Sequence, residues 1–232
     1  CVLIGGIAGD NLTTGSSNIA IGKHALGATT IGNSNVAVGH ASLQTNVAAD
    51  RNVAVGHQTL TSMTSATTAD TYNTAVGYNA GFAVTSGTNN TIVGGLAGDS
   101  LTTGSQNTVL GRAALSAEDT GSKTVAIGYG ALFAQNYDGD SYNTAVGHNA
   151  GTAVTIGIQN TLIGCAAGDA LTEGDNNVAV GYLALTAETL GDRSVAIGRG
   201  TLQNQNNTSD VDVYNIAIGY NAGGAVTTGT KN

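Results

Sequence analysis

Ten side chains that could do chemistry recur at one position of a repeated sequence unit. Each follows directly after a glycine and is Lys, His, Tyr or Arg, in a chain with only 4 His, 8 Tyr and 7 Lys plus Arg. They are Lys23, His40, His57, Tyr78, Arg112, Tyr129, His148, Tyr182, Arg199 and Tyr220. Aromatic faces stack on sugar rings and guanidinium groups hold acidic groups, so this series could bind a ligand. The alternative is a structural stack in which these side chains cover one another, and we favour it over specific binding.

The glycines before these residues close a five-residue unit, Asn-x-[small or apolar]-[Val/Ile/Leu]-Gly, which repeats along the whole chain. We call them the coil glycines and number each coil position from its own glycine, so that the series above is the +1 column. The coil glycines are Gly5, Gly22, Gly39, Gly56, Gly77, Gly94, Gly111, Gly128, Gly147, Gly164, Gly181, Gly198 and Gly219. Nine of the twelve steps are 17 residues, and the others are 19 or 21. Such a period predicts an all-β parallel β-solenoid of thirteen coils, a single repeat domain over residues 1–232.

The three residues before each coil glycine form the predicted strand. Positions −3 and −1 are Val, Ile, Leu or Thr, and position −2 is alanine in nine of thirteen coils. Because side chains alternate along a strand, both faces of this strand are apolar, and such strands are buried on both faces. One face fits the coil interior, and the mostly alanine face predicts the close approach of a partner chain. This is the main sequence argument for an oligomer.

Two corners of the coil are marked by their residue types. Asparagine stands at position −4 in ten coils, where it can adopt left-handed backbone, bond its own turn and stack into an amide ladder. These residues are Asn18, Asn35, Asn52, Asn73, Asn90, Asn107, Asn143, Asn160, Asn177 and Asn215. A second glycine follows at position +10 in nine coils. Two corners predict two strands per coil, a flattened roll.

Coil types recur with a longer period, which gives four-coil blocks at residues 77–146 and 147–218. The long coils carry the segments Thr61–Tyr72, Phe133–Tyr142 and Gln203–Tyr214. Loops on a rigid scaffold often carry recognition residues, so we predict recognition at the loop tips, whereas the closing tyrosines are predicted to anchor the loops. Neither end of the chain shows a polar cap, so we expect a segment of a longer fibre or protomers that stack end to end.

Composition excludes several classes of function. The net charge of −8 argues against a nucleic-acid partner, since such a partner requires a basic face. No apolar run approaches the ~20 residues of a membrane-spanning helix, so we expect no membrane insertion by this segment. His40 and His57 are expected to stack ~4.8 Å apart, but two imidazoles alone make a poor metal site. No phosphate loop, nucleophile motif or paired-carboxylate cleft is present, so we expect no metal, no cofactor and no enzyme.

Asn35-Val-Ala-Val-Gly39 and Ser194-Val-Ala-Ile-Gly198 resemble the head repeats of trimeric autotransporter adhesins. The runs of the Asn-Thr-Ala-Val-Gly-Tyr type are similar to those of some phage tail-fibre proteins. The resemblance covers all thirteen coils and implies a left-handed β-roll, three chains around one axis, and an extracellular adhesive or host-recognising fibre on a cell surface or virion. It implies the chain itself as partner, in a homotrimer, and a cell-surface glycan or matrix protein as ligand. The 17-residue coil is longer than the usual head repeat, and no neck, stalk or anchor is present.

Three functions therefore compete. The first is the structural and adhesive fibre, with a filament of end-to-end copies as its variant. The second is a surface-binding solenoid of the ice-binding kind, to which the pairs Thr13-Thr14, Thr102-Thr103 and Thr227-Thr228 point. The third is an acyltransferase on a hexapeptide helix, which Ile31–Val36 fits locally, although coils of 17 residues do not sustain a six-residue period. We rank them in this order.

Overall fold

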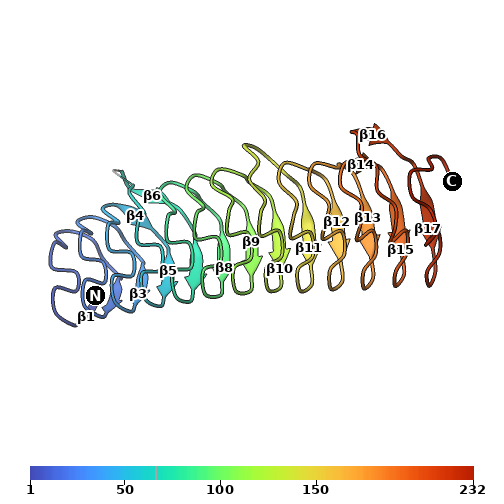
Figure 1. Ribbon diagram of the computed structural model, residues 1–232. Coiled ribbons are helices and arrows are strands. Elements are labelled where there is room, and N and C mark those ends of the chain that lie inside the picture. The colour runs from blue at the N-terminus through green and yellow to red at the C-terminus, as the bar shows by residue number, and fades with distance from the viewer. Residues whose placement is uncertain (66) are drawn as a thin grey trace.

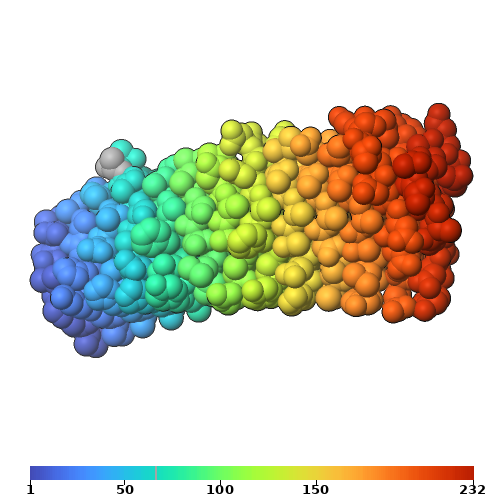
Figure 2. Space-filling model, in the orientation of Figure 1, coloured from blue at the N-terminus to red at the C-terminus, as the bar shows by residue number. Residues whose placement is uncertain are grey.

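The computed structural model describes residues 1–65 and 67–232, and within them the chain forms a solenoid of β-strands and turns (Figure 1). Ala66, which falls within the first predicted recognition loop, lies outside the described residues. The coils follow one another along one axis, with the two termini at opposite ends (Figure 1). Their side chains pack together into an elongated body (Figure 2). The predicted all-β parallel solenoid of thirteen coils is thus confirmed. Within the described residues, no helix has the length and hydropathy to cross a bilayer.

One strand of each coil enters a thirteen-stranded parallel sheet that runs the length of the molecule. Each strand consists of the three residues before a coil glycine, and neighbours pair in register, so that Ala20 lies beside Ala37 and Ala37 beside Ala54. The strands are β1 (Val2–Ile4), β2 (Ile19–Ile21), β3 (Val36–Val38), β5 (Val53–Val55), β7 (Thr74–Val76), β8 (Thr91–Val93), β9 (Thr108–Leu110), β10 (Val125–Ile127), β11 (Thr144–Val146), β12 (Thr161–Ile163), β13 (Val178–Val180), β15 (Val195–Ile197) and β17 (Ile216–Ile218).

The coil glycines end these strands because of their backbone conformation. Their φ values lie between 121° and 146°, a region that glycine adopts and other residues rarely do. Neighbouring coils also approach closely here. A Cβ on Gly111 would lie 2.3 Å from the carbonyl oxygen of Gly128 in the next coil. Glycine is therefore required at this corner both by its φ and by the contact between coils.

The prediction that the alanine face meets a partner chain is wrong, because that face lines the coil interior. The alanines at position −2, such as Ala37 and Ala126, are fully buried. They share the interior with leucines at position +4. In three of the six coils with glycine at +4, the −2 residue is larger: Leu162 fills the space that a side chain on Gly168 would occupy, with its Cδ2 2.8 Å from the position of that Cβ. Positions −3 and −1 consequently face outward.

The prediction of two strands per coil is also wrong. Outside the thirteen-stranded sheet, on the second side of the coil, strand pairing is limited to two-residue strands. These are β4 (Ala49–Asp50) with β6 (Ala69–Asp70), and β14 (Gly191–Asp192) with β16 (Val211–Asp212). Elsewhere the described backbone turns, because positions +2 and +4 are left-handed. Gln58 and Leu60, for example, have φ of 52° and 48°. Left-handed residues at alternate positions cannot form a strand, whose φ is strongly negative.

The corner asparagines form a buried polar column, which we call the asparagine spine. Each is at most 1% exposed. The Oδ1 atom accepts a hydrogen bond from the backbone N–H of the residue at −4 in the next coil, as from Asn107 to Asn90 at 3.0 Å. The Nδ2 atom donates to the carbonyl at the second corner of its own coil, position +10, as from Asn90 to Gly104 at 2.9 Å. The spine thus bonds each coil to the next one along the chain.

Two details of the predicted asparagine corner are corrected by this geometry. The left-handed residue is the one before the asparagine, for example Ser34 before Asn35, with φ of 58°. The amides bond mainly to backbone groups rather than to one another, although Asn52 Nδ2 also donates to Asn35 Oδ1 at 3.1 Å. A buried amide that bonds a backbone donor of the next coil and a backbone acceptor at the end of its own coil leaves neither group unpaired, which explains why asparagine recurs there.

Candidate functional site

The +1 column lies along one edge of the sheet, where each coil glycine turns the chain away from its strand. All ten predicted side chains of the column are exposed. The column divides into three groups at Gly95 and Cys165, which contribute no large side chain. The groups contain His40, His57 and Tyr78; Arg112, Tyr129 and His148; and Tyr182, Arg199 and Tyr220. Lys23 precedes the first group.

Within each group the side chains stack on one another. His40 and His57 have ring centroids 5.0 Å apart, and His57 and Tyr78 are 5.5 Å apart, with both pairs nearly parallel. The Arg199 guanidinium lies between two tyrosine rings, 5.6 Å from the centroid of Tyr182 and 5.3 Å from that of Tyr220. These contacts support the structural stack, since aromatic and cation–π contacts between coils each stabilise by about 0.5–1 kcal/mol at exposed sites. Specific binding by the column stays a prediction.

The histidine pair does not form a metal site by itself. Its rings are stacked with an interplanar angle of 18°, so their in-plane nitrogen lone pairs do not converge on one point. Across the described residues, no three His, Cys, Asp or Glu side chains gather in a way that would hold a metal ion.

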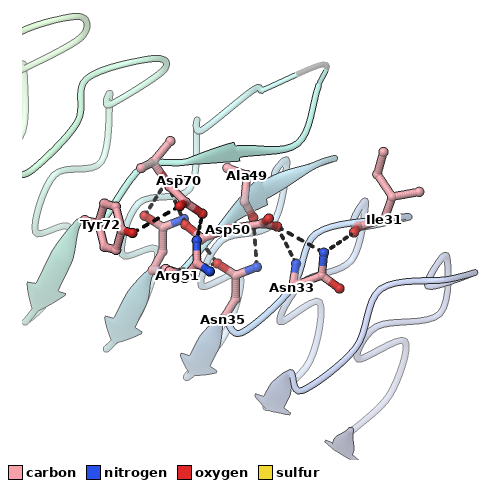
Figure 3. A network of polar contacts seen from close by, with 10 residues as sticks. Ile31, Asn33, Asn35, Ala49, Asp50, Arg51, Asp70 and Tyr72 are labelled. Atoms are coloured by element: carbon pink, nitrogen blue, oxygen red, sulfur yellow. Dashed lines mark hydrogen bonds and ion pairs between the residues drawn. The ribbon is translucent and has the colours of Figure 1, made fainter.

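The closing tyrosines of the long coils form three equivalent contacts, which we call the corner clasps. In the first, Asp70 is bonded by both Arg51 and Tyr72 (Figure 3). The guanidinium of Arg51 also lies 5.7 Å from the centroid of the Tyr72 ring. The others consist of Lys123, Asp140 and Tyr142, and of Arg193, Asp212 and Tyr214. These bonds support the predicted anchoring role of Tyr72, Tyr142 and Tyr214.

The second clasp shifts the pKa values of its two charged groups. The hydrogen bond from Lys123 lowers the pKa of Asp140, and the same bond raises the pKa of Lys123. The Lys123 Nζ to Asp140 Oδ2 distance is 2.6 Å. Because both side chains are exposed, we expect the ion pair to add little to stability.

We call the four coils before Gly77 the first block, and the blocks at 77–146 and 147–218 the second and third. Sequence reasoning missed a buried polar cluster in the second block. Glu118, at position +7, is fully buried, although the residue at this position is Leu, Val or Met in seven of the thirteen coils and a neutral polar residue in four. Its carboxylate accepts hydrogen bonds from Gly121 N, Gln135 Nε2 and Tyr137 N. Burial raises the pKa of Glu118 despite these bonds. The recurrence of Glu at +7 followed by Gln at +7 of the next coil, as in Glu118 and Gln135, was the signal that could have revealed the cluster.

The third block repeats this cluster 70 residues later. Glu188 is fully buried and accepts from Gly191 N, from Gln205 Nε2 and from both nitrogens of Asn207. Both clusters lie where the asparagine spine is interrupted, at Thr124 and Ser194. There the glutamine donates to the hydroxyl of Thr124 or Ser194 and accepts from the next spine asparagine, Asn143 or Asn215. The clusters therefore replace the missing amide of the spine.

Three hollows lie on the flank that borders the +1 column. Each is lined by residues at positions +2 and +5 of neighbouring coils, with further positions that differ between hollows, and they have volumes of about 340, 540 and 610 Å³. The middle one is lined by Leu96, Arg112, Ala113, Ser116, Tyr129, Gly130, Phe133, Asn149 and Thr152. It brings together Arg112 and Tyr129 of the predicted column with Phe133, which begins the second predicted loop.

The described side chains thus offer stacked rings, exposed cations and shallow hollows on a rigid scaffold. Such groups can bind a ligand by stacking, ion pairing and hydrogen bonding. Comparison with protein-family models, with curated proteins and with solved structures finds no match to this chain.

Proposed function

We propose that this chain is a structural and adhesive segment of an extracellular fibre, on a cell surface or virion, assembled from copies of itself. The observation that carries the proposal is the outward face of the thirteen-stranded sheet, formed by positions −3 and −1. The role we propose is recognition and mechanical support rather than catalysis. The resemblance to adhesin head repeats points in the same direction.

The outward face is mostly apolar along its length. Position −1 is Val, Ile or Leu in every coil, and position −3 is Val, Ile or Thr. In the middle of the sheet, Leu110 is still 45% exposed. Thirteen strands at ~4.8 Å spacing and three residues in width give a strip on the order of 600 Å². That is at the upper end of the apolar patches that soluble monomers expose, about 300–600 Å².

A second copy of the chain fits this face by size and shape. A stable interface buries about 800 Å² on each partner, so the strip supplies most of what one interface requires. The side chains are short and repeat at the strand spacing, so two such faces can pack as sheets do, about 10 Å apart. A trimer of the adhesin kind would use this self-association, whereas a filament of end-to-end copies would join the two ends of the solenoid.

A charge placed on the outward face tests the proposal. Val93→Lys puts an ammonium group in the middle of the strip, and we expect it to dissociate the assembly in sedimentation velocity. Ser34→Lys is the matched control, because Ser34 is exposed away from this face in the left-handed position that Lys123 occupies in another coil. An assembly that survives Val93→Lys unchanged would contradict the proposal.

A surface-binding role, including binding to ice, is the second candidate. Threonine replaces valine or isoleucine at position −3 in five strands, beginning with Thr74 in β7, which gives the outward face a partly hydroxylated row. The threonine pairs predicted for this role are less suitable, since Thr13 and Thr102 donate to backbone carbonyls of the next coil. A monomer that shows thermal hysteresis would favour this candidate over the fibre.

A further inference from the structure

We infer that the middle hollow of the flank is a binding site for an acidic oligosaccharide, with the carboxylate of a sugar on Arg112 and sugar rings on Tyr129 and Phe133. The inference rests on the proposed adhesive function and names its ligand class. We call this hollow the Arg112 hollow.

The Arg112 hollow has the size of a ligand site. Its volume of about 540 Å³ lies within the range of about 300–1,000 Å³ that is typical of small-molecule sites. Residues from four consecutive coils line it, so an extended ligand would lie along the solenoid axis rather than across one coil.

Two aromatic rings in the hollow are open to solvent. Tyr129 is 48% exposed and Phe133 is 47% exposed. Phe133 is one of only 2 phenylalanines in the chain, and its exposed ring does not contribute to the hydrophobic core. Aromatic rings offer a broad apolar face, on which the C–H face of a sugar packs without loss of the sugar's outer hydrogen bonds.

Arg112 supplies a positive charge that no carboxylate neutralises. The ion pairs of the described residues involve Arg51, Lys123 and Arg193, and none includes Arg112. Its guanidinium lies 5.7 Å from the centroid of the Tyr129 ring, and Nη1 donates to Tyr129 Oη at 3.4 Å. The lining of the hollow contains no Asp or Glu, although the chain has a net charge of −8. A guanidinium fork can hold a carboxylate with two parallel hydrogen bonds.

The floor of the hollow is open because Gly130 has no side chain. A Cβ there would lie 2.7 Å from Asn149 Oδ1 and would begin to fill the space. The corresponding residue of the first block is Gln58, which has the same left-handed backbone, with φ of 52° against 61° for Gly130. There the counterpart of Asn149, Asn79, has its Oδ1 buried without a partner. In the Arg112 hollow, Asn149 and Thr152 present polar groups beside the rings, as sugar hydroxyls require, whereas the Ser116 hydroxyl donates to Asp99 Oδ1 at 2.5 Å.

The other two hollows lack this combination. The first, of about 340 Å³, includes the carboxylate of Asp10 and no exposed tyrosine or phenylalanine. The third, of about 610 Å³, is lined by Gln203, Asn221 and small or apolar residues, without a charge or a ring. Of the three hollows, the middle one combines aromatic rings, a cation and an open floor. We therefore expect one binding site in each chain.

The test is binding of the full chain to an array of uronate, sialylated, sulfated and neutral oligosaccharides, followed by calorimetric titration of the best binder. We expect binding to acidic members, and a loss of at least tenfold in affinity when the carboxylate is converted to its methyl ester. Gly130→Gln should abolish binding by filling the floor with the residue that the first block carries. Gly200→Gln, the same change 70 residues later, is the matched control and should bind as the native chain does.

Each outcome decides between the alternatives. Arg112→Gln should remove the preference for acid over ester, while Phe133→Ala should weaken both. Equal binding of acid and ester, or binding that survives Gly130→Gln, would overturn the inference. The particle mass is measured on the same samples: an assembled particle that binds no acidic saccharide refutes this site alone, whereas a monomer refutes the proposed fibre itself.

Discussion

The strand side and the flank of each coil share one backbone but differ in how far their residues vary. On the strand side, the coil glycine never changes and the asparagine changes in three of thirteen coils. On the flank, position +5 carries residues as different as Asp99, Phe133 and Gly224. The difference separates two tasks: the strand side holds the coils together, and the flank can change its chemistry without changing the fold.

The physical reason lies in what each side contacts. Each residue of the strand side bonds or packs against the coils before and after it. A substitution there therefore disrupts contacts with two coils at once. A flank residue at +1 or +5 projects into solvent and meets its neighbours only through its own side chain. Substitutions should therefore have effects that fall steadily from the strand side to the flank.

The largest loss of stability is expected from a substitution at a coil glycine. Gly111→Ala introduces a Cβ at φ of 134°, at 2.3 Å from the carbonyl oxygen of Gly128. We expect a loss of more than about 4 kcal/mol in the free energy of unfolding, measured by urea denaturation. Gly95→Ala is the control, because its Cβ would meet only Tyr78 O at 4.0 Å, and it should be neutral. Equal stability of the two variants would contradict the account of the strand corner.

The asparagine spine should give the next largest effect. Asn90→Ala leaves the N–H of Asn107 and the carbonyl of Gly104 without their partner. Buried unpaired groups cost about 1–3 kcal/mol each, so we expect a clear fall in the urea midpoint and faster amide exchange at the two neighbouring coils. Asn89→Gln is the control, since Asn89 is exposed and Gln106 occupies the same left-handed position one coil later.

The buried Glu118 cluster should make stability depend on pH. Because burial raises the pKa of Glu118 in the folded chain, its contribution is complete below the unfolded value of 4.5 and is lost as pH rises through the folded value. The comparison is with a chain that carries the first block's residues, in which Asn and Met replace Glu118 and Gln135 and Asn replaces Thr124. On going from pH 8 to pH 5, the melting temperature of the native chain should rise relative to this variant. A constant difference between the two would contradict the assignment.

Substitutions in the corner clasps should reduce stability least. Lys123→Ala removes an exposed ion pair and a cation–π contact, and we expect a small loss of stability at low salt and a smaller one at high salt. Asp140 has a lowered pKa, so its contribution is present above its unfolded value of 3.8 and is lost as pH falls through the lower folded value. Urea denaturation at two salt concentrations measures the effect. A loss as large as that of Asn90→Ala would show that the clasps belong to the scaffold.

The sequence correctly predicted the repeating coils of the fold. It did not predict which face of each strand points into the coil interior. The coil glycines and spine asparagines fixed the number and register of the strands, because one residue type recurs at one spacing. Alternation along Val36-Ala37-Val38 shows that two faces exist, but which one is inside depends on leucines at position +4, half a coil away. The second side was mistaken for a strand because left-handed backbone at Gln58 and Leu60 has no distinctive residue type.

The candidate site was predictable only in part. Arg112 and Tyr129 were found because the +1 column recurs after each coil glycine. Phe133 was noted as the start of a loop, but its place beside Arg112 depends on the stacking of coils in register. Gly130 gave no signal, since its role is the absence of a side chain above Asn149. The buried position of Glu118 likewise follows from the packing of the interior.

The mass of the native particle, measured by light scattering across a range of concentrations, tests most directly whether the outward strand face joins copies of this chain. The account predicts a particle near three times 22.8 kDa, or a larger assembly that grows with concentration. A particle of 22.8 kDa at every concentration would contradict it, because the apolar strip would then remain open to water.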